Sequence, residues 1–352
     1  MGLNLSAIDL GFLYTKSIVN GKKHIMKSVV GHGKQLRFRD LDMGNKDKDD
    51  IIFYAEPDAS GKKPTSFVSD LAIDQSDVIL HSLQDKRFDS AVTDVLARTA
   101  LAKGFGHGSF ETKVVSGLPV SHYAMYKEDI TKMFLGTTKT GKVHPYEVEF
   151  DRQRAIKGEV FTDEGKFIPQ PFGALLDFLL DDNGNFRDKS IASKTIAVID
   201  PGFGTTDVYV VDGMSPVEKH TFSIKVAMNY AYQIIANRIE EDLGKTIPLY
   251  EVEGIVRTGE FRKGGKRLDM KPLIKYAFDA TSDKMMSDIL NKWKDGIHDI
   301  EMILVAGGGG ANLFKGIQEH VENVQLLPDP QWAVVNGYYK WGVRTYGKTV
   351  LI

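Results

Sequence analysis

Two segments far apart in this 352-residue chain follow the same pattern, which limits the folds that the chain can form. In each, a run of mainly apolar residues leads to an aspartate, Asp9 or Asp200, and glycine and hydroxyl residues follow closely. Such a run predicts a strand. Glycine lets backbone amides approach an anion, and a carboxylate can hold a hydrated metal ion. The repeat therefore predicts two halves of a phosphate-binding site, each at the end of a strand.

The length of the chain predicts two domains with a cleft between them, because one hydrophobic core rarely grows so large. Each half has the pattern of a strand meander followed by helices. We place the first domain at residues 1–190 and the second at residues 191–335. We expect a C-terminal helix, residues 336–352, to pack back on the first domain.

Composition excludes several classes of function. Lys and Arg number 45 against 47 for Asp and Glu, a net charge of -2, which argues against direct binding of nucleic acid. The absence of cysteine excludes disulfides, thiolate nucleophiles and thiolate-bound metals. The nine histidines have no metal-ligand spacing. No signal-peptide pattern or membrane-length apolar run occurs, so we expect a soluble cytoplasmic protein without a membrane partner.

The turn after Asp200 is the more specific half of the repeat. No segment has the spacing of a Walker phosphate loop, and Asp207 stands where a dinucleotide-binding turn needs its last glycine. The turn instead joins a metal-capable acid to two glycines and two hydroxyls, and the alternative is a tight hairpin with capping hydroxyls. The phosphate-binding residues that we predict here are Gly202, Gly204, Thr205 and Thr206.

The turn after Asp9 is a weaker pattern that Lys16 strengthens. Across a hairpin turn from Asp9, the Lys16 ammonium could reach the β- and γ-phosphates as a point charge. With Lys16 we predict Gly11 and Thr15 as binding residues. The bulky residues 12–14 follow Gly11, and they would be strained wherever the turn needs a positive φ.

Four consecutive glycines follow a predicted strand near residues 302–306. Without Cβ atoms, the backbone there could lie directly against an adenosine, with a helix N-terminus facing phosphate. The alternative is a plain junction between strand and helix. The binding residues predicted here are Gly307, Gly308, Gly309, Gly310 and Asn312.

One further segment, residues 262–267, is compact and basic. A solvated turn is the simpler interpretation. The alternative is an electrostatic contact with another copy of the chain or with an acidic partner.

In motif order the chain resembles the superfamily of actin, sugar kinases and heat-shock-70 ATPases, and most closely the bacterial plasmid-segregation actins called ParM or StbA. The segments that resemble its motifs are Asp9 to Lys16 for the first phosphate motif, Gln170 to Ala174 for the first connecting motif, Asp200 to Asp207 for the second phosphate motif, Val305 to Asn312 for adenosine and Ala333 to Tyr338 for the second connecting motif.

The resemblance implies an α/β fold of the actin-like, duplicated ribonuclease H-like type, with two domains around a nucleotide cleft. It also implies an ATPase that converts ATP and water to ADP and phosphate and forms filaments. Asp9 and Asp200 would hold Mg²⁺ through its waters, and Gln170 would orient the attacking water. Gln170, Asp200 and Asp9 are thus the expected catalytic residues.

By the same resemblance, the protein would move plasmid copies apart, with itself as polymer partner and a DNA-binding adaptor on a centromere-like site. A small-molecule kinase on this fold would need an aspartate base, and none stands out. A structural filament is a further alternative. The sequence does not distinguish ATP from GTP, nor a plasmid from other DNA cargo.

Overall fold

A computed structural model describes residues 4–39, 48–81, 90–138 and 140–347 of the chain. The chain divides into two compact units. Unit 1 comprises residues 1–118, 122–187 and 335–352, and unit 2 comprises residues 119–121 and 188–334. Of the helix expected at residues 336–352, residues 348–352 lie outside the described part.

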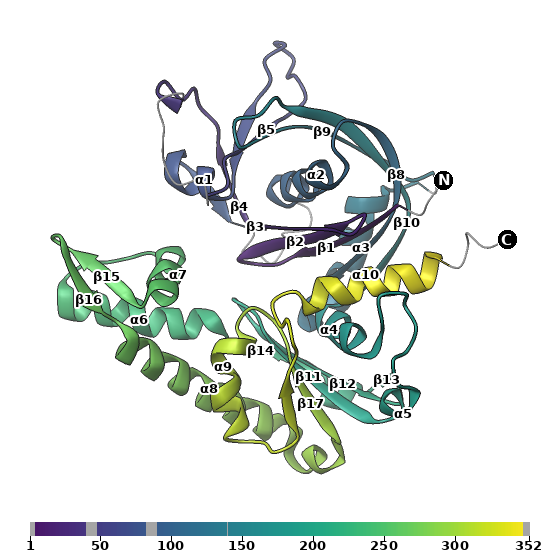
Figure 1. Cartoon of the computed structure of the whole chain (residues 1–352), viewed down its shortest axis with the longest axis vertical. Coiled ribbons are helices and arrows are strands. Elements are labelled where there is room, and N and C mark those ends of the chain that lie inside the picture. Colours follow the sequence, from purple (N-terminus) through teal and green to yellow (C-terminus); the bar gives the residue numbers. More distant parts are fainter. Residues whose placement is uncertain (1–3, 40–47, 82–89, 139, 348–352) are drawn as a thin grey trace. The chain divides into compact units, whose positions relative to one another are not determined.

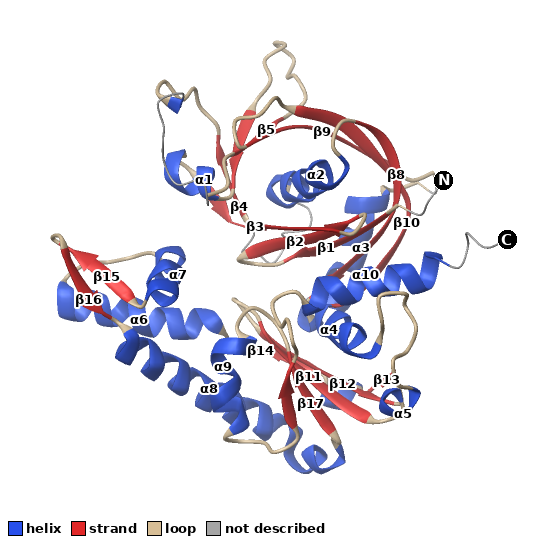
Figure 2. Cartoon of the chain, in the orientation of Figure 1, coloured by secondary structure: helices blue, strands red, loops and turns tan. Residues whose placement is uncertain are grey.

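Unit 1 is built on a ten-stranded mixed sheet with the strand order β3-β2-β1-β8-β10-β9-β5-β6-β4-β7 (Figure 1). Helix α2 lies in the concave side of this curved sheet (Figure 2). Its elements are β1 (Leu5–Leu10), β2 (Tyr14–Val19), β3 (Lys22–Lys27), β4 (Val29–His32), β5 (Ile51–Tyr54), β6 (Thr65–Val68), α1 (Asp70–Gln75), β7 (Ile79–His81), α2 (Ala91–Phe105), β8 (Gly108–Leu118), α3 (Val120–Leu135), β9 (Lys142–Phe150), β10 (Ile156–Pro169), α4 (Gln170–Leu179) and α10 (Ala333–Tyr346).

Unit 2 carries a second mixed sheet in the order β13-β12-β11-β17-β18, with β14 also paired to β12. Strands β15 and β16 form a separate hairpin. Its elements are α5 (Lys189–Ala192), β11 (Thr195–Pro201), β12 (Thr206–Asp212), β13 (Ser215–Pro216), η3 (Glu218–His220), β14 (Phe222–Ile224), α6 (Met228–Leu243), α7 (Leu249–Thr258), β15 (Glu260–Lys263), β16 (Lys266–Asp269), α8 (Lys271–Trp293), η4 (Lys294–Asp299), β17 (Met302–Val305), α9 (Gly310–Gln318) and β18 (Val324–Leu326).

The two sheets repeat one arrangement. In unit 1, β1 pairs antiparallel with β2 and parallel with β8. In unit 2, β11 pairs antiparallel with β12 and parallel with β17. The strands that carry Asp9 and Asp200 are therefore equivalent in the two units. This is the duplicated α/β architecture that the sequence predicts.

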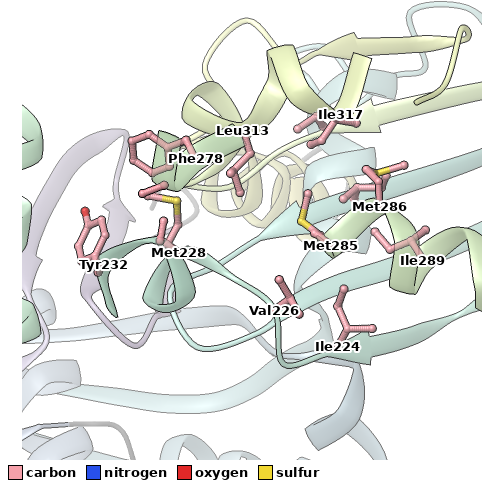
Figure 3. Close-up of a cluster of buried hydrophobic side chains, with 14 of the residues drawn as sticks. Ile224, Val226, Met228, Tyr232, Phe278, Met285, Met286, Ile289, Leu313 and Ile317 are labelled. Atoms are coloured by element: carbon pink, nitrogen blue, oxygen red, sulfur yellow. The ribbon is translucent and has the colours of Figure 1, made fainter. Parts of the chain in front are cut away.

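The core of unit 2 lies between its sheet and the helices α6, α8 and α9 (Figure 3). Met285, Met286 and Ile289 project from α8 toward Leu313 and Ile317 of α9, and all are almost completely buried. Ile224 and Val226 extend this cluster just before α6 begins. This packing holds the start of α6 beside the turn after Asp200, where the Met228 amide donates to the Gly202 carbonyl over 3.2 Å.

In unit 1, helices α4 and α10 cross at two glycines. A Cβ atom on Gly337 would lie 1.7 Å from the carbonyl oxygen of Gly173, so only glycine allows this approach. One turn further along, Lys340 Nζ lies 2.6 Å from Asp177 Oδ1, and both side chains are largely buried. The crossing holds the start of α4, where Gln170 stands.

Candidate functional site

Three of the predicted site residues meet in unit 1. The register of β1 and β2 places Asp9 directly opposite Lys16, and Lys16 Nζ lies 2.9 Å from Asp9 Oδ2. Gln170, the first residue of α4, donates a hydrogen bond from Nε2 to Asp9 Oδ1 over 2.9 Å. Strands β1, β8 and β10 run parallel, so their carboxyl ends share one edge of the sheet. That edge brings residues 9 and 170 together.

Burying the charges of Asp9 and Lys16 costs free energy, so the stability of the fold does not by itself account for this group of three residues. Asp9 is 4% exposed and Lys16 is 9% exposed. Removing two charges from water costs free energy that their mutual attraction does not always recover. The Lys16 ammonium has further donors for a phosphate oxygen, and the Asp9 carboxylate has remaining lone pairs for a metal-bound water. The arrangement can therefore bind a hydrated cation next to an anion.

The Gly11 turn is stabilised by hydrogen bonds from Ser28, a residue that the sequence analysis did not identify. Ser28 donates from its hydroxyl to the Gly11 carbonyl over 2.8 Å, and its Oγ lies 2.9 Å from the Thr15 hydroxyl. Thr15 is 1% exposed. Its side chain thus has a structural contact with Ser28, and its contact with a ligand stays a prediction. In the sequence, Ser28 is marked only by its position between two strands, which does not indicate a contact with Gly11.

The bulky residues after Gly11 fit the turn without backbone strain. Phe12, Leu13 and Tyr14 all have negative φ. Gly11 itself is needed for space, since a Cβ there would lie 2.5 Å from the Tyr14 carbonyl oxygen. The strain expected for a positive φ at these positions does not arise.

In unit 2, the Asp200 carboxylate rests against the glycine segment. A Cβ on Gly307 would lie 2.0 Å from Asp200 Oδ1, and Gly307 has a φ of 77°. A Cβ on Gly309 would lie 2.5 Å from Met228 Cγ, and the Gly309 amide donates to the Pro201 carbonyl. Of these four glycines, only Gly308 is both exposed and free of neighbours within 4 Å of its Cβ position. Packing within the chain thus explains two of the four glycines.

The predicted ligands at the start of α9 lie on its first turn. Gly310 is the first residue of this helix and is buried, and Asn312 is exposed. The helix therefore begins two residues after the open Gly308, and a helix N-terminus favours an anion.

The turn after Asp200 is partly closed by its own hydrogen bonds. The Gly202 amide donates to the Thr205 carbonyl over 2.9 Å, so in this conformation it does not face a ligand. Thr206 is fully buried, and its hydroxyl donates to the Val226 carbonyl over 2.7 Å. Strand alternation thus turns the Thr206 side chain into the core, and the role of Thr206 in cofactor binding stays a prediction. The turn residues with partial exposure include Gly204 and Thr205.

Asp207 has a structural role that the sequence did not reveal. It is 3% exposed and accepts hydrogen bonds from the Ser223 hydroxyl and from the Val120 amide, the latter over 3.2 Å. Ser223 in turn accepts from the Ser121 amide over 3.0 Å. The acid that ends the motif thus anchors residues 119–121 to unit 2.

Each half-site offers one buried carboxylate, Asp9 or Asp200, rather than a full set of metal ligands. The described residues contain no group of three or more His, Cys, Asp or Glu side chains that could hold a metal ion. A cation held through its waters by single carboxylates fits this donor set better than a directly caged one. Among the described helices, none is long and apolar enough to span a membrane.

Two family models match the sequence. One describes the N-terminal domain of actin-like proteins and matches residues 7–173. The other describes the C-terminal part of the archaeal actin homologue MreB-like proteins and matches residues 198–319. Together they cover most of the chain and include every predicted site residue. No curated protein matches the sequence with significance.

Solved structures with the same fold cover nearly the whole chain. The archaeal actin homologue Ta0583 superposes with a TM-score of 0.78 at 18% identity, over 97% of this chain and 100% of that chain. The apo psk41 ParM protein superposes with a TM-score of 0.71 at 19% identity, over 99% of each chain. A 15-stranded ParM filament from Clostridium botulinum superposes with a TM-score of 0.73 at 20% identity, over 97% of this chain and 99% of that chain. Ta0583 also has a solved complex with ADP, at a TM-score of 0.77 and 18% identity, over 97% and 100%.

Proposed function

Because this chain belongs to the actin-like protein family, we propose that it is an ATPase that forms filaments when it binds nucleotide. The observation that carries the proposal is the meeting of Lys16 and Gln170 on the buried Asp9 carboxylate. An equivalent strand of unit 2 presents Asp200 beside an open glycine turn. We propose that one nucleotide engages both half-sites.

The residues divide the work of phosphate binding. Lys16 neutralises charge on the β- and γ-phosphates, and the amides of Gly204 and Thr205 bind the γ-phosphate. Gly308 gives the adenosine room to lie against the backbone. Asp9 and Asp200 would hold Mg²⁺, and this ion would supply positive charge that neutralises the transferred group.

Gln170 positions the attacking water. Its amide nitrogen is committed to Asp9, which leaves the carbonyl oxygen of the same side chain to accept a hydrogen bond from water. An amide is no general base at neutral pH, so its contribution is orientation. Catalysis then rests on positioning and electrostatics, as in other phosphoryl transfers.

We further propose that the filament segregates plasmid DNA. The ParM proteins among the similar structures support this assignment. The net charge of -2 favours a DNA-binding adaptor over direct contact with DNA.

The proposal is tested by light scattering and phosphate release with ATP and Mg²⁺ and no added acceptor. We expect polymer to appear and phosphate to be released. Hydrolysis without polymer over a wide concentration range would contradict the filament. A requirement for a small-molecule acceptor would identify a kinase instead.

Two substitutions separate binding from chemistry. Asp200→Ala should abolish turnover, because it removes the carboxylate of unit 2. Gln170→Leu should lower turnover about 100-fold while nucleotide affinity changes little, since this side chain acts on the water. Unchanged turnover in either variant, measured alongside binding of a fluorescent ATP analogue, would remove that residue from the site.

A further inference from the structure

A cavity of about 370 Å³ opens on unit 2, lined by residues from the end of α6, from strand β16 and from the start of α8. Leu243, Leu268 and Leu273 line it, and all three are only half-buried. Arg238 contributes a cation to the same wall. Apolar surface left open in this way is typical of a binding surface.

The hairpin beside this cavity concentrates like charges. Its register places Lys263 opposite Lys266 and Arg262 opposite Arg267, around the turn Gly264–Gly265. All four cations are exposed. Like charges directly opposite each other destabilise a hairpin. Stability of the fold therefore does not account for this pattern.

One of the two pairs faces the cavity. Side chains alternate along a strand, so Lys263 and Lys266 share a face with Leu268 in the cavity wall. Lys263 also donates to the carbonyl of Leu243, another lining residue, over 2.5 Å. Lys266 forms no ion pair with any residue in the described ranges. The edge of an apolar cavity thus carries cations that the chain itself does not neutralise.

A complementary surface lies on α3 of unit 1. This helix buries Ile130, Met133 and Phe134 on one side. On the other side Met125 is 67% exposed, with Glu128 and Asp129 three and four residues later on the same face. The Glu128 side chain is 87% exposed and has only a 3.7 Å ion pair with Lys132. An apolar side chain flanked by two acids therefore projects from α3.

Met125 fits the cavity better than the other large exposed apolar side chains of the described residues. Methionine is long and flexible enough to fill an irregular apolar gap. Phe38 lies beside the exposed Arg37, which the lysines of the hairpin would repel. Tyr230 and Tyr276 lie on α6 and α8, the helices that form the cavity. The remaining ones are Val78, Leu80 and Val143, which are shorter and do not lie on a helix.

We propose that this cavity binds the α3 surface of a second copy of the chain, with Met125 in the cavity and Glu128 and Asp129 facing Lys263 and Lys266. The proposal rests on the proposed filament and identifies one of its contacts. The two surfaces differ, so the contact is heterologous and can continue from copy to copy.

Cysteine cross-linking tests the contact directly, because the natural chain contains no cysteine. Met125→Cys and Leu273→Cys are made as separate proteins, mixed with ATP and Mg²⁺, and treated with a short bis-maleimide. We expect a covalent dimer in the mixture and none with either variant alone. A mixture of Leu273→Cys with Ser60→Cys, at an exposed site of unit 1, should give none.

Sedimentation of the same samples separates the two proposals. Polymer without the cross-link would overturn this contact and leave the filament proposal intact. Absence of polymer from the unmodified chain together with absence of the cross-link would overturn both.

Exchange of charges between the two surfaces tests the same contact without a cross-linking reagent. Lys263→Glu with Lys266→Glu should raise the critical concentration for polymerisation about tenfold or more, and so should Glu128→Lys with Asp129→Lys. All four changes in one chain should largely restore the original value. Arg262→Glu with Arg267→Glu, on the opposite face of the hairpin, is the matched control and should change it little.

Two results would overturn the proposal in this experiment. One is an equal effect of the control pair. The other is an unchanged critical concentration with loss of duplex-DNA binding in the Lys263→Glu, Lys266→Glu variant, which would assign the surface to nucleic acid.

Discussion

Glycine serves two purposes in the segment Gly307–Gly310. Gly307 gives room to the protein's own Asp200 carboxylate, whereas Gly308 leaves space that no part of the described chain fills. Gly307 thus allows Asp200 to pack against the backbone, whereas Gly308 leaves the surface of the half-site free for a ligand.

Alanine at these two glycines should therefore have different effects. Gly307→Ala places a methyl group against Asp200 in a backbone conformation that disfavours it, so it should lower the melting temperature and weaken ATP binding at least tenfold. Gly308→Ala is the matched control for stability and should leave the melting temperature nearly unchanged. Equal melting temperatures for the two variants, measured by calorimetry, would contradict this geometry.

A second prediction at this scale concerns acid. Burial lowers the pKa of His144 to about 4, outweighing its hydrogen bond to the Phe134 carbonyl. The unfolded chain takes up this proton near pH 6.5, so the contribution to stability is complete above pH 6.5 and is lost progressively toward pH 4.

Urea unfolding of the natural chain and of His144→Gln between pH 7 and pH 4 measures this loss. As the pH is lowered from 7 to 4, the free energy of unfolding should decrease more steeply in the natural chain than in the variant. Parallel pH profiles would show that folding does not lower the pKa of His144.

Among the elements, the crossing of α4 and α10 sets the position of Gln170. The crossing depends on the contact of Gly337 with the Gly173 carbonyl and on the ion pair of Lys340 with Asp177. Two helices that approach this closely cannot separate without moving the first turn of α4.

Gly337→Ala should therefore destabilise unit 1 by about 2 kcal/mol or more, because a methyl group would overlap with backbone. Gly254→Ala in α7 is the matched control. It has no neighbour within 4 Å of its Cβ position, so alanine should raise stability slightly through helix propensity. Denaturant midpoints compare the two, and a Gly337→Ala variant as stable as the control would contradict the crossing.

At the scale of the whole molecule, the duplicated plan places equivalent strands, β1 and β11, behind the two acidic turns. If both half-sites bind one nucleotide, ATP with Mg²⁺ binds only the folded chain and raises its melting temperature. The increase should be lost in Lys16→Ala and in Asp200→Ala alike, since either change removes one half of the site. Thermal unfolding with and without ATP measures it. An increase that survives one of these changes in full would confine nucleotide to the other unit.

Sequence alone determined the two acidic turns, the glycine segment and the duplicated order of strands and helices. These follow from local chemistry: apolar strands end at polar turns, and glycine permits what other residues cannot. Tertiary structure decided which of those residues meet. Strand pairing over more than 150 positions brings Gln170 to Asp9, and packing puts Ser28 under Gly11 and turns Thr206 into the core. No local pattern records those contacts, because each depends on which strands become neighbours in the sheet.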